Sequence, residues 1–346
     1  MSLIDFGGTK EEVVMRDEFP MKKAREVLKD ETVAIIGYGV QGPGQGLNLK
    51  DNGFRVIVGQ SKQFPEDWDR AVKDGWKPGV DLFEIEDAVK RATIVEVLVA
   101  DAAHKKVWPL IKKNLKPGAA IYFSHGFSIV YKDQTKIIPP KNIDVIMVAP
   151  KGPGALVRET FLAGIGVPAL IAVHQDHSGK AKNYALAIAK GLMATTRGVI
   201  ETTFKEETET DLFGEQVDLC GGSSQLVKTS FEVLVKAGYQ PEIAYFEVLH
   251  ELKLIIDLVQ KGGIEGMWDG VSNTAEYGGR TRGPMIIDDG VKERMNRILK
   301  DIQSGKFAKE WVAERDAGMP TLTKLRMEGE KSQIEVVGRR IRKMFK

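Results

Sequence analysis

Short apolar runs rich in β-branched residues alternate with longer polar or amphipathic segments between Thr32 and Val173. This alternation is typical of a parallel β-sheet flanked by helices. Hydrophobicity is continuous within each run, which indicates strands that are buried on both faces. The runs predict strands at Val33–Ile36, Arg55–Val58, Ile94–Val99, Ala120–Phe123, Val145–Val148 and Ala169–Val173. The segments between them predict helices at Gly46–Asn52, Asp67–Asp74, Leu82–Ala92 and His104–Asn114.

After about Glu201 the β-branched runs become scarce and long helical patterns take over. They predict helices at Glu206–Cys220, Ser223–Ala237, Glu242–Lys261, Gly290–Ser304 and Ser332–Phe345. A length of 346 residues fits two domains of about 150 residues each. We therefore expect a Rossmann-type, doubly wound α/β domain over residues 1–200, followed by an all-helical domain over residues 201–346.

The charge balance excludes several classes of partner. Lys and Arg total 50 against 48 Asp and Glu, so the formal net charge is only +2. That balance gives no global field to hold nucleic acid or an anionic membrane.

No apolar run approaches the roughly 18 residues of a membrane span, and the amino terminus lacks the pattern of a signal peptide. The one cysteine, Cys220, cannot form an intramolecular disulfide, so we expect a cytoplasmic protein.

A glycine-rich segment, Gly37-Tyr-Gly-Val-Gln-Gly42, directly follows the first predicted strand and precedes a helix. In that position Gly37 allows a tight turn, Gly39 lets backbone amides approach a pyrophosphate, and Gly42 allows close packing of strand and helix. The phosphates would then lie at a helix N-terminus, where N–H groups and the helix dipole favour negative charge. The segment predicts a dinucleotide site; a purely structural turn is the alternative.

The choice of nucleotide depends on the end of the second strand, where NAD-binding sites usually place an acid. Here the chain continues as Gly59-Gln-Ser-Lys-Gln-Phe64, which contains no acid. Ser61 and Lys62 could hold the extra phosphate of NADP through charge-assisted hydrogen bonds. Because Lys62 is a single cation and Glu66 and Asp67 follow it, NADP is favoured without excluding NADH.

Two pairs of carboxylates stand at i, i+4 spacing, Asp211 with Glu215 and Glu247 with Glu251. At 100° per residue the second pair shares a stripe with Leu254 and Leu258, which predicts that this stripe faces protein. Buried carboxylates need a counter-charge, and an all-oxygen ligand set that leaves room for water and substrate suits Mg²⁺. Four carboxylates could hold two such ions. Salt bridges in an oligomer interface are the alternative.

Two further polar residues follow predicted strands, at the edge of the sheet where ligands of open α/β sheets bind. His125 lies in Phe123-Ser-His-Gly-Phe127 and Lys151 in Ala149-Pro-Lys-Gly-Pro-Gly154. Position alone leaves a structural histidine and a surface lysine equally plausible. The segment Ser272-Asn-Thr-Ala-Glu-Tyr-Gly278 is polar and turn-like, and by its chemistry alone it could be a plain loop.

Taken together, these motifs resemble ketol-acid reductoisomerase, the isomeroreductase of branched-chain amino-acid biosynthesis, in its short form with one helical domain. They follow the family's order across nearly the whole chain. The motifs are Gly37-Tyr-Gly-Val-Gln-Gly42, Ser124-His-Gly-Phe127, Val148-Ala-Pro-Lys-Gly-Pro-Gly154, Asp211-Leu-Phe-Gly-Glu-Gln216, Ala244-Tyr-Phe-Glu247, His250-Glu-Leu-Lys-Leu254 and Ser272-Asn-Thr-Ala-Glu-Tyr-Gly278.

The resemblance implies roles for individual residues. Asp211 would bridge two Mg²⁺ ions, Glu215 would complete one site, and Glu247 and Glu251 would contribute to the other. Ser272 and Glu251 would contact substrate, His125 would be catalytic, and Lys151 would lie beside the metal and substrate. Cofactor contacts are implied for the glycine-rich segment (Gly37, Tyr38, Gly39, Val40, Gln41 and Gly42) and for Ser61, Lys62, Asp101 and Gly154.

The implied reaction is an alkyl migration in a 2-hydroxy-2-acyl acid such as 2-acetolactate or 2-aceto-2-hydroxybutyrate, followed by reduction with NADPH. The family's helical domain is knotted and interleaves with a second copy, so a homodimer or larger homo-oligomer with shared active sites is implied. This chain has Val40 where many members carry Ser and Pro43-Gly44 where they carry His-Ala. The loop Gln60–Trp68 also lacks arginines that many NADPH-dependent members have.

Two other interpretations remain open from sequence. A metal-free NADP-dependent β-hydroxyacid dehydrogenase also joins a Rossmann domain to a helical domain, and it would use a lone lysine as catalyst. A nucleotide-sensing protein without catalysis would use the acidic pairs for interface salt bridges. The dehydrogenase has no need for four placed carboxylates.

Overall fold

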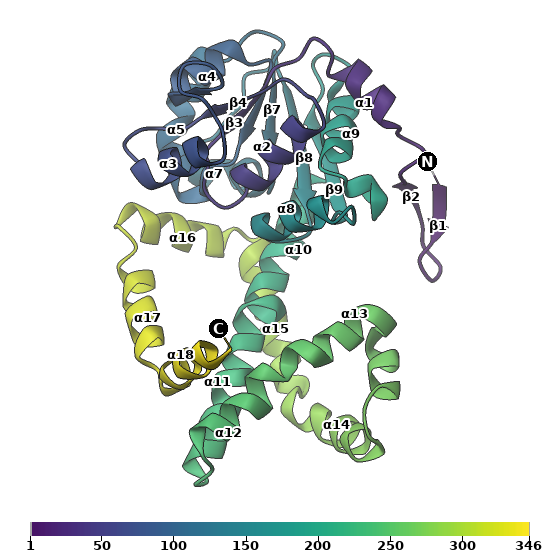
Figure 1. Ribbon diagram of the computed structural model, residues 1–346, viewed down its shortest axis with the longest axis vertical. Helices are drawn as coiled ribbons and strands as arrows, with labels where there is room; N and C mark the ends of the chain where they lie inside the picture. The colour runs from purple at the N-terminus through teal and green to yellow at the C-terminus, as the bar shows by residue number, and fades with distance from the viewer. Residues whose placement is uncertain (1, 346) are drawn as a thin grey trace. The chain divides into compact units, whose positions relative to one another are not determined.

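The computed structural model describes residues 2–345, apart from the side chains of Asp101 and Ala102. The chain forms two compact units that divide between Thr208 and Glu209, within helix α10, Phe204–Gly214 (Figure 1). The boundary expected from sequence, after residue 200, lies slightly earlier. Among the described helices, none has the length and apolar character needed to cross a bilayer.

The first unit contains one ten-stranded sheet in the order β1-β2-β10-β9-β8-β7-β6-β3-β4-β5 (Figure 1). The stretch from β5 to β8 is parallel and has the strand order 3-2-1-4-5-6 of a Rossmann fold. The predicted α/β fold is therefore confirmed. The strands are β1 Ser2–Asp5, β2 Lys10–Val14, β3 Val33–Ile36, β4 Val56–Gly59, β5 Leu82–Phe83, β6 Ile94–Val97, β7 Ala120–Phe123, β8 Asp144–Pro150, β9 Ala169–Gln175 and β10 Val199–Glu201.

Helices connect these strands on both faces of the sheet (Figure 1). Helix α2 begins at Gly42, the last residue of the glycine-rich segment, and so before the predicted start at Gly46. The other helices of this unit are α1 Met21–Val27, α3 Pro65–Lys73, α4 Ile85–Arg91, α5 Asp101–Asn114, α6 Phe127–Val130, α7 Lys132–Thr135, α8 Gly154–Leu162, α9 Ala181–Gly191 and a 3₁₀ turn Ala194–Thr196.

The sheet departs from the sequence prediction at one edge. Strand β9 pairs with β8 antiparallel, and β2 pairs antiparallel with both β1 and β10. A run of continuous hydrophobicity indicates burial on both faces, but it does not indicate strand direction. The sequence prediction of a wholly parallel sheet was therefore wrong beyond β8.

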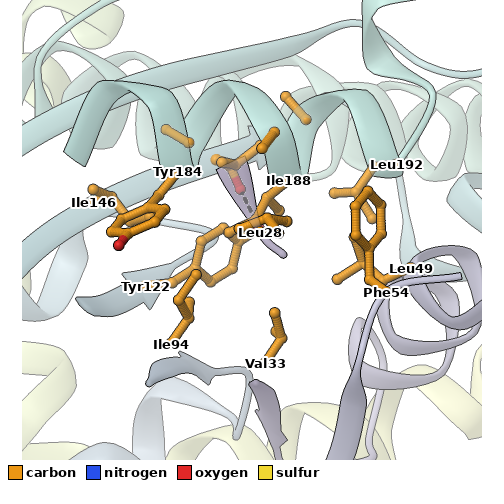
Figure 2. Close-up of a cluster of buried hydrophobic side chains, with 14 of the residues drawn as sticks. Leu28, Val33, Leu49, Phe54, Ile94, Tyr122, Ile146, Tyr184, Ile188 and Leu192 are labelled. Atoms are coloured by element: carbon orange, nitrogen blue, oxygen red, sulfur yellow. Dashed lines mark hydrogen bonds between the residues drawn. The ribbon is translucent and has the colours of Figure 1, made fainter. Parts of the chain in front are cut away.

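Two apolar clusters cover the two faces of the sheet. One cluster packs alternate side chains such as Val33, Ile94 and Tyr122 against helices that include α9 (Figure 2). The other packs the intervening residues, such as Ala34, Val95 and Ile121, against α4 and α5. This two-sided burial fixes the strands, and it also fixes the loops that leave their carboxyl ends.

The second unit is entirely helical, as predicted. Two of its helices contain a π-helical turn, at Glu215–Leu219 and at Phe246–His250. In each turn a backbone N–H donates to the carbonyl five residues earlier, Cys220 to Glu215 and Glu251 to Phe246, both at 3.1 Å. The α-helices are α11 Gly221–Lys236, α12 Pro241–Tyr245, α13 Leu252–Asp269, α14 Asn273–Ile286, α15 Asp289–Gln303, α16 Lys306–Asp316, α17 Pro320–Lys331 and α18 Gln333–Met344.

Little of this helical unit is buried within one chain. Its core cluster contains Val227, Phe231, Ala244, Tyr245, Ile334 and Ile341. Many large apolar side chains remain exposed, among them Leu219, Leu226, Val233, Leu254, Ile256, Ile264, Met285 and Ile286. Exposed apolar surface of this extent is uncommon on a soluble monomer.

Candidate active site

The glycine-rich segment forms a tight turn between β3 and α2. Gly37 has φ +99°, a left-handed conformation that favours glycine, and a Cβ there would collide with the backbone of Val99. A Cβ on Gly42 would meet the Gly37 carbonyl. The bare backbone thus lets the first turn of α2 close over the strand, as the dinucleotide motif requires.

A cavity of about 380 Å³ lies over this turn. Five of the predicted cofactor residues line it: Gly37, Tyr38, Gly39, Val40 and Gln41. Its other walls come from the end of β6 and the segment after it, from α5, from the loop after β7 and from residues beyond β4. They include Val97, Val99, His104, Ser124, His125, Phe64 and Asp67. A glycine cradle at a helix N-terminus, open to a cavity of this size, fits a dinucleotide.

Side chains of α3 and of the segment after it support the glycine-rich turn. The buried Tyr38 hydroxyl accepts a hydrogen bond from Trp76 Nε1 at 2.8 Å and lies 3.0 Å from Asp74 Oδ2. Arg70 donates to the Gly39 carbonyl at 2.9 Å. These contacts fix the loop before any ligand arrives, which reduces the entropy lost on binding.

The remaining predicted cofactor residues have different surroundings. Gly154 begins α8 and packs against the backbone of Val40, where a Cβ would collide with the Val40 carbonyl. The described residues around the cavity do not include Ser61 or Lys62. The side chain of Asp101 lies outside the described residues. Gly154 therefore supports the loop by close packing.

An acid that the sequence pattern did not reveal lies beside the loop after β4. The Lys62 N–H donates to the Glu84 carboxylate at 3.2 Å, and Glu84 follows β5. The Lys62 ammonium lies 5.0 Å from the centre of the Trp68 ring. A negative charge from the neighbouring strand thus lies beside the one cation of the loop.

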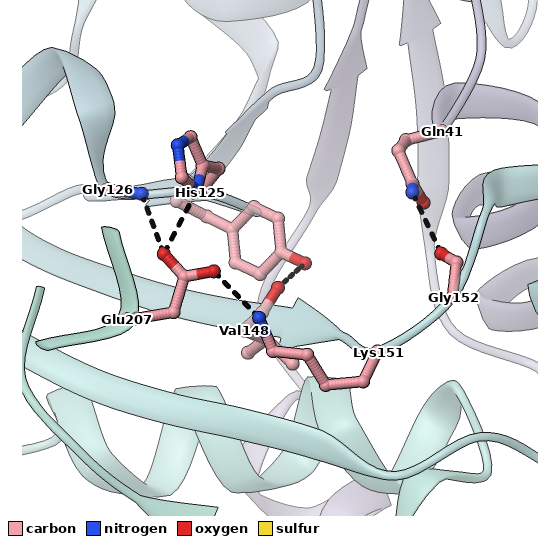
Figure 3. Close-up of polar contacts among 8 residues, drawn as sticks. Gln41, His125, Gly126, Val148, Lys151, Gly152 and Glu207 are labelled. Atoms are coloured by element: carbon pink, nitrogen blue, oxygen red, sulfur yellow. Dashed lines mark hydrogen bonds and ion pairs between the residues drawn. The ribbon is translucent and has the colours of Figure 1, made fainter. Parts of the chain in front are cut away.

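Glu207 joins the two predicted polar residues at the sheet edge (Figure 3). Its carboxylate accepts from Lys151 Nζ at 2.9 Å and contacts His125 Nδ1 at 3.1 Å. The backbone N–H of Gly126 also donates to it, at 3.2 Å. The structure therefore brings His125 and Lys151 together, as the sequence suggested, through a third residue that the sequence analysis missed.

Glu207 is an ionised carboxylate in a buried position, with 1% of its side chain exposed. Burial alone would raise its pKa. The hydrogen bond from His125 and the charges of His125 and Lys151 outweigh burial, so the pKa of Glu207 is lowered from its usual value. Since an ionised carboxylate only accepts, the His125 proton in this contact lies on Nδ1.

A sequence signal for Glu207 was present. Glu207 stands four residues before Asp211, which itself stands four before Glu215, so the three acids mark one side of a helix. Its place beside Glu206 in a first helical turn made it resemble an ordinary acid that favours the helix dipole. Glu207 is distinguished from Glu206 only by its contacts with the loops that follow β7 and β8.

The predicted metal carboxylates lie in the helical unit. Asp211 is half-buried on α10, and Glu215 begins the first π-turn. Within residues 209–345, the described side chains include no group of three His, Cys, Asp or Glu residues whose ligand atoms lie within 4.8 Å of one another. One chain's helical unit therefore does not assemble the predicted four-carboxylate cluster.

The burial predicted for the second acidic stripe was wrong for the isolated chain. Glu247, Glu251 and Leu254 are all exposed. The spacing of 100° per residue also does not hold between Glu247 and Glu251, because the π-turn contains Glu247 and ends just before Glu251. Whether a second chain covers this stripe stays a prediction.

The segment at Ser272 is a helix start. The Ser272 hydroxyl accepts from the Ala275 N–H at 3.2 Å and caps α14. Serine at this position stabilises a helix by satisfying an otherwise unpaired donor. The plain loop that the chemistry of the segment alone would allow is therefore not what forms.

Comparison with known families decides among the interpretations. Residues 27–198 match the family model of the acetohydroxy acid isomeroreductase NADPH-binding domain, and residues 204–346 match that of the ketol-acid reductoisomerase C-terminal domain. The chain belongs to the ketol-acid reductoisomerase family. The alternatives of a β-hydroxyacid dehydrogenase and of a non-catalytic nucleotide sensor are thereby set aside.

Individual relatives agree with this assignment. The chain is 55% identical to "Ketol-acid reductoisomerase (NADP(+))" of Pyrobaculum arsenaticum over 321 residues, 92% of this chain and 95% of that protein. It is 51% identical to the protein of the same name from Methanocaldococcus jannaschii, over 92% of this chain and 94% of that one. A solved NADH-preferring ketol-acid reductoisomerase from an uncultured archaeon matches with a TM-score of 0.91 and 44% identity, covering 96% of this chain and 98% of that one.

Proposed function

We propose that this chain catalyses the reaction of its family, a Mg²⁺-dependent alkyl migration in 2-acetolactate or 2-aceto-2-hydroxybutyrate followed by reduction with NADPH. The product would be a 2,3-dihydroxy-3-alkyl acid of valine, isoleucine and leucine biosynthesis. The observation that carries the proposal is the contact of Glu207 with His125 and Lys151, since His125 also lines the dinucleotide cavity. Proton-transfer groups beside a nicotinamide site suit a reduction that also needs a proton.

Glu207, His125 and Lys151 would perform the proton handling. Glu207 holds the Lys151 ammonium, so Lys151 presents a fixed positive charge to a negatively charged substrate oxygen. Glu207 also orients the His125 ring, so Nε2 can hold or release a proton at a reacting hydroxyl. Both residues stand on loops that leave buried strands, which limits their movement.

Asp211, Glu215, Glu247 and Glu251 would hold the two Mg²⁺ ions. Carboxylate oxygens are the donor set that Mg²⁺ prefers, and among the described ion pairs none involves Glu247 or Glu251 within the chain. When bound, the ions would polarise the substrate carbonyl and lower the pKa of the adjacent hydroxyl. Glu251 and Ser272 would also contact substrate.

We further propose a homodimer, or a larger homo-oligomer, whose active sites combine carboxylates of two chains. The support is the extensive apolar surface of the helical unit together with the exposure of Glu247 and Glu251. A second copy would cover that surface and would bring its acidic pair to the partner's Asp211 and Glu215. We expect a cytoplasmic enzyme with no nucleic-acid or membrane partner.

One assay tests the activity: NADPH oxidation with 2-acetolactate, with Mg²⁺ or with a chelator. We expect turnover that needs Mg²⁺ and that Asp211→Asn abolishes while nucleotide binding survives. Turnover that persists in the chelator would refute the two-metal proposal. Absence of turnover in the Mg²⁺-loaded wild type with either substrate would refute the function itself.

Subunit mixing tests the shared site. Asp211→Asn and Glu247→Gln chains should each be inactive alone. If one site takes Asp211 from one chain and Glu247 from the other, half of the sites in a mixed dimer are intact, and refolding the two variants together restores about one quarter of wild-type activity. No recovery, in a mixture shown to contain mixed dimers, would place both residues of a site on one chain.

The nucleotide preference is the remaining part of the proposal. NADPH is the expected cofactor, and we infer that NADH is also used, because Glu84 places a negative charge at the loop that would meet the 2′-phosphate. A carboxylate there repels a phosphate and can accept from a ribose hydroxyl. The loop contains a single lysine and no arginine to compensate.

A further inference from the structure

A closed set of hydrogen bonds lies in the buried core below the glycine-rich loop. Gln45 Nε2 donates to Ser124 Oγ at 2.8 Å, and the Tyr122 hydroxyl donates to Gln45 Oε1 at 2.6 Å. Ser124 Oγ and the Tyr122 hydroxyl are 3.0 Å apart. Ser124 can donate to Tyr122, so each of the three side chains both gives and receives a bond. Hydrogen bonds arranged in this way strengthen one another.

This set reaches three loops that border the proposed site. Gln45 also donates to Gln41 Oε1 at 3.2 Å, and Gln41 lines the nucleotide cavity. Gln41 donates in turn to the Gly152 carbonyl at 3.3 Å (Figure 3), next to Lys151. Ser124 directly precedes His125. The network therefore links the glycine-rich loop to both loops that carry the proton-transfer residues.

The members of the network are uncharged, which suits a positioning role. Gln45 is uncharged, and the pKa of Tyr122 lies well above its usual value, because its burial and the nearby Glu96 both disfavour the phenolate. The Val148 carbonyl, at 2.8 Å on the strand that leads to Lys151, is an alternative acceptor for the single Tyr122 hydroxyl proton. Gln45 and Tyr122 have no exposed surface.

A core position of this kind is normally apolar, since burying an amide and a hydroxyl stabilises less than burying hydrocarbon. Buried polar groups instead select a single arrangement of the side chains, because hydrogen bonds have directional requirements that apolar packing lacks. A displacement of about 1 Å between reacting groups can lower a rate about a hundred-fold. Such a network would therefore affect the rate by fixing the positions of the loops.

We propose that Gln45 and Tyr122 are positioning residues that hold the His125 and Lys151 loops in register with the dinucleotide loop. Binding of the nucleotide at Gln41 thereby orders the loops that carry His125 and Lys151. This inference rests on the reductase function proposed above.

The test compares Tyr122→Phe with Tyr184→Phe. Both changes remove one hydroxyl from the same core (Figure 2), but Tyr184 bonds Glu31, away from the three loops. We expect Tyr122→Phe to lower kcat at least about ten-fold, while the dissociation constant for NADPH without substrate changes less than about two-fold. Tyr184→Phe should leave kcat unchanged. Gln45→Leu should resemble Tyr122→Phe, and the two changes combined should cost little more than either alone.

Hydrogen exchange gives a readout that does not depend on turnover. NADPH should slow exchange at the Gly126 amide, which donates to Glu207, and at the Lys151 and Gly152 amides. That protection should disappear in Tyr122→Phe and remain in Tyr184→Phe. Equal kcat in the two variants, or unchanged protection in Tyr122→Phe, would overturn the inference. Loss of kcat in parallel with nucleotide affinity and thermal stability would do so too, because it would indicate a merely structural role.

The two proposals fail separately. If wild type shows the nucleotide-dependent protection but no turnover of 2-acetolactate, the proposed function fails and the coupling stands. If wild type turns over but Tyr122→Phe matches it, the coupling fails and the function stands.

Discussion

Glu96 is a carboxylic acid in the centre of the sheet with no hydrogen-bond partner. It lies on β6 between Ile35 of β3 and Tyr122 of β7, and none of its surface is exposed. In the described part of the chain, neither of its carboxyl oxygens is hydrogen-bonded. Burial raises the pKa of Glu96 from 4.5 to about 8. Its neighbour Tyr122 is the titratable group that faces it across the strands, and it stays neutral.

This shift makes the stability of the first unit depend on pH. Between pH 4.5 and 8 the folded chain keeps a proton that the unfolded chain releases, so folding loses stability as pH rises through that window. Each pH unit costs about 1.4 kcal/mol, which gives about 3 kcal/mol at pH 7 and roughly 5 kcal/mol well above pH 8. Below pH 4.5 the cost is absent.

Glu96→Gln removes the ionisation and keeps the shape of the side chain. We expect the variant and wild type to have free energies of unfolding within about 1 kcal/mol at pH 5, and the variant to be more stable by roughly 4 kcal/mol at pH 8.5. The assay is urea unfolding, followed by tryptophan fluorescence, at several values of pH between these limits. Linear extrapolation gives the difference directly if the slopes agree.

Asp144 provides the control, since it is equally buried but fully bonded. Its carboxylate accepts from the His177 N–H at 2.7 Å, the Ser178 N–H at 2.9 Å and the Ser178 hydroxyl at 2.6 Å. Asp144→Asn should therefore be less stable than wild type at pH 8.5, the opposite sign. If Glu96→Gln follows wild type across the whole range, or is the less stable protein at pH 8.5, the carboxyl is not an isolated buried acid and the reasoning is refuted.

Three further predictions concern the site. Glu207→Gln should lower kcat about a hundred-fold with little change in NADPH affinity, because it removes the charge that holds its two partners; an unchanged kcat in steady-state assays would exclude that role. Gly154→Ala should weaken NADPH binding about ten-fold in a fluorescence titration, because the new methyl group collides with Val40. Gly152→Ala is the control and should not weaken binding, because its methyl group meets only ordinary contacts at 3.6 Å. Glu84→Gln should raise the ratio of NADPH to NADH affinity several-fold, and an unchanged ratio would show that this carboxylate does not select the nucleotide.

The strands around the glycine-rich loop could be predicted closely because their pattern reflects burial on both faces. Strands β3 and β7 have the predicted bounds, and β4 is displaced by one residue. Helix α2 starts four residues early because Gly42 and Gly44 lack the side chains on which an amphipathic pattern depends. Strand direction beyond β8 could not be predicted, since hydrophobicity does not encode it.

The candidate site was predicted in parts. His125 and Lys151 were found by their place after strands, a signal that depends only on topology. Glu207 was missed because its importance lies in contacts with two loops distant in sequence. The apolar stripe with Glu247 and Glu251 was recognised, but periodicity cannot say whether a stripe is covered by the same chain or by another copy.

The two π-turns give the helical unit an unusual sensitivity to chain length. A surface helix usually tolerates a substitution better than an insertion or deletion that changes its register. Here each acidic pair has a member within a π-turn, which contains one residue more than a turn of α-helix. Deleting one residue within Phe246–His250 would restore a uniform α-helix, yet it would rotate everything after it, starting with Glu251, by about 100°. In engineered or natural variants, substitutions in these turns should therefore be tolerated far better than insertions or deletions.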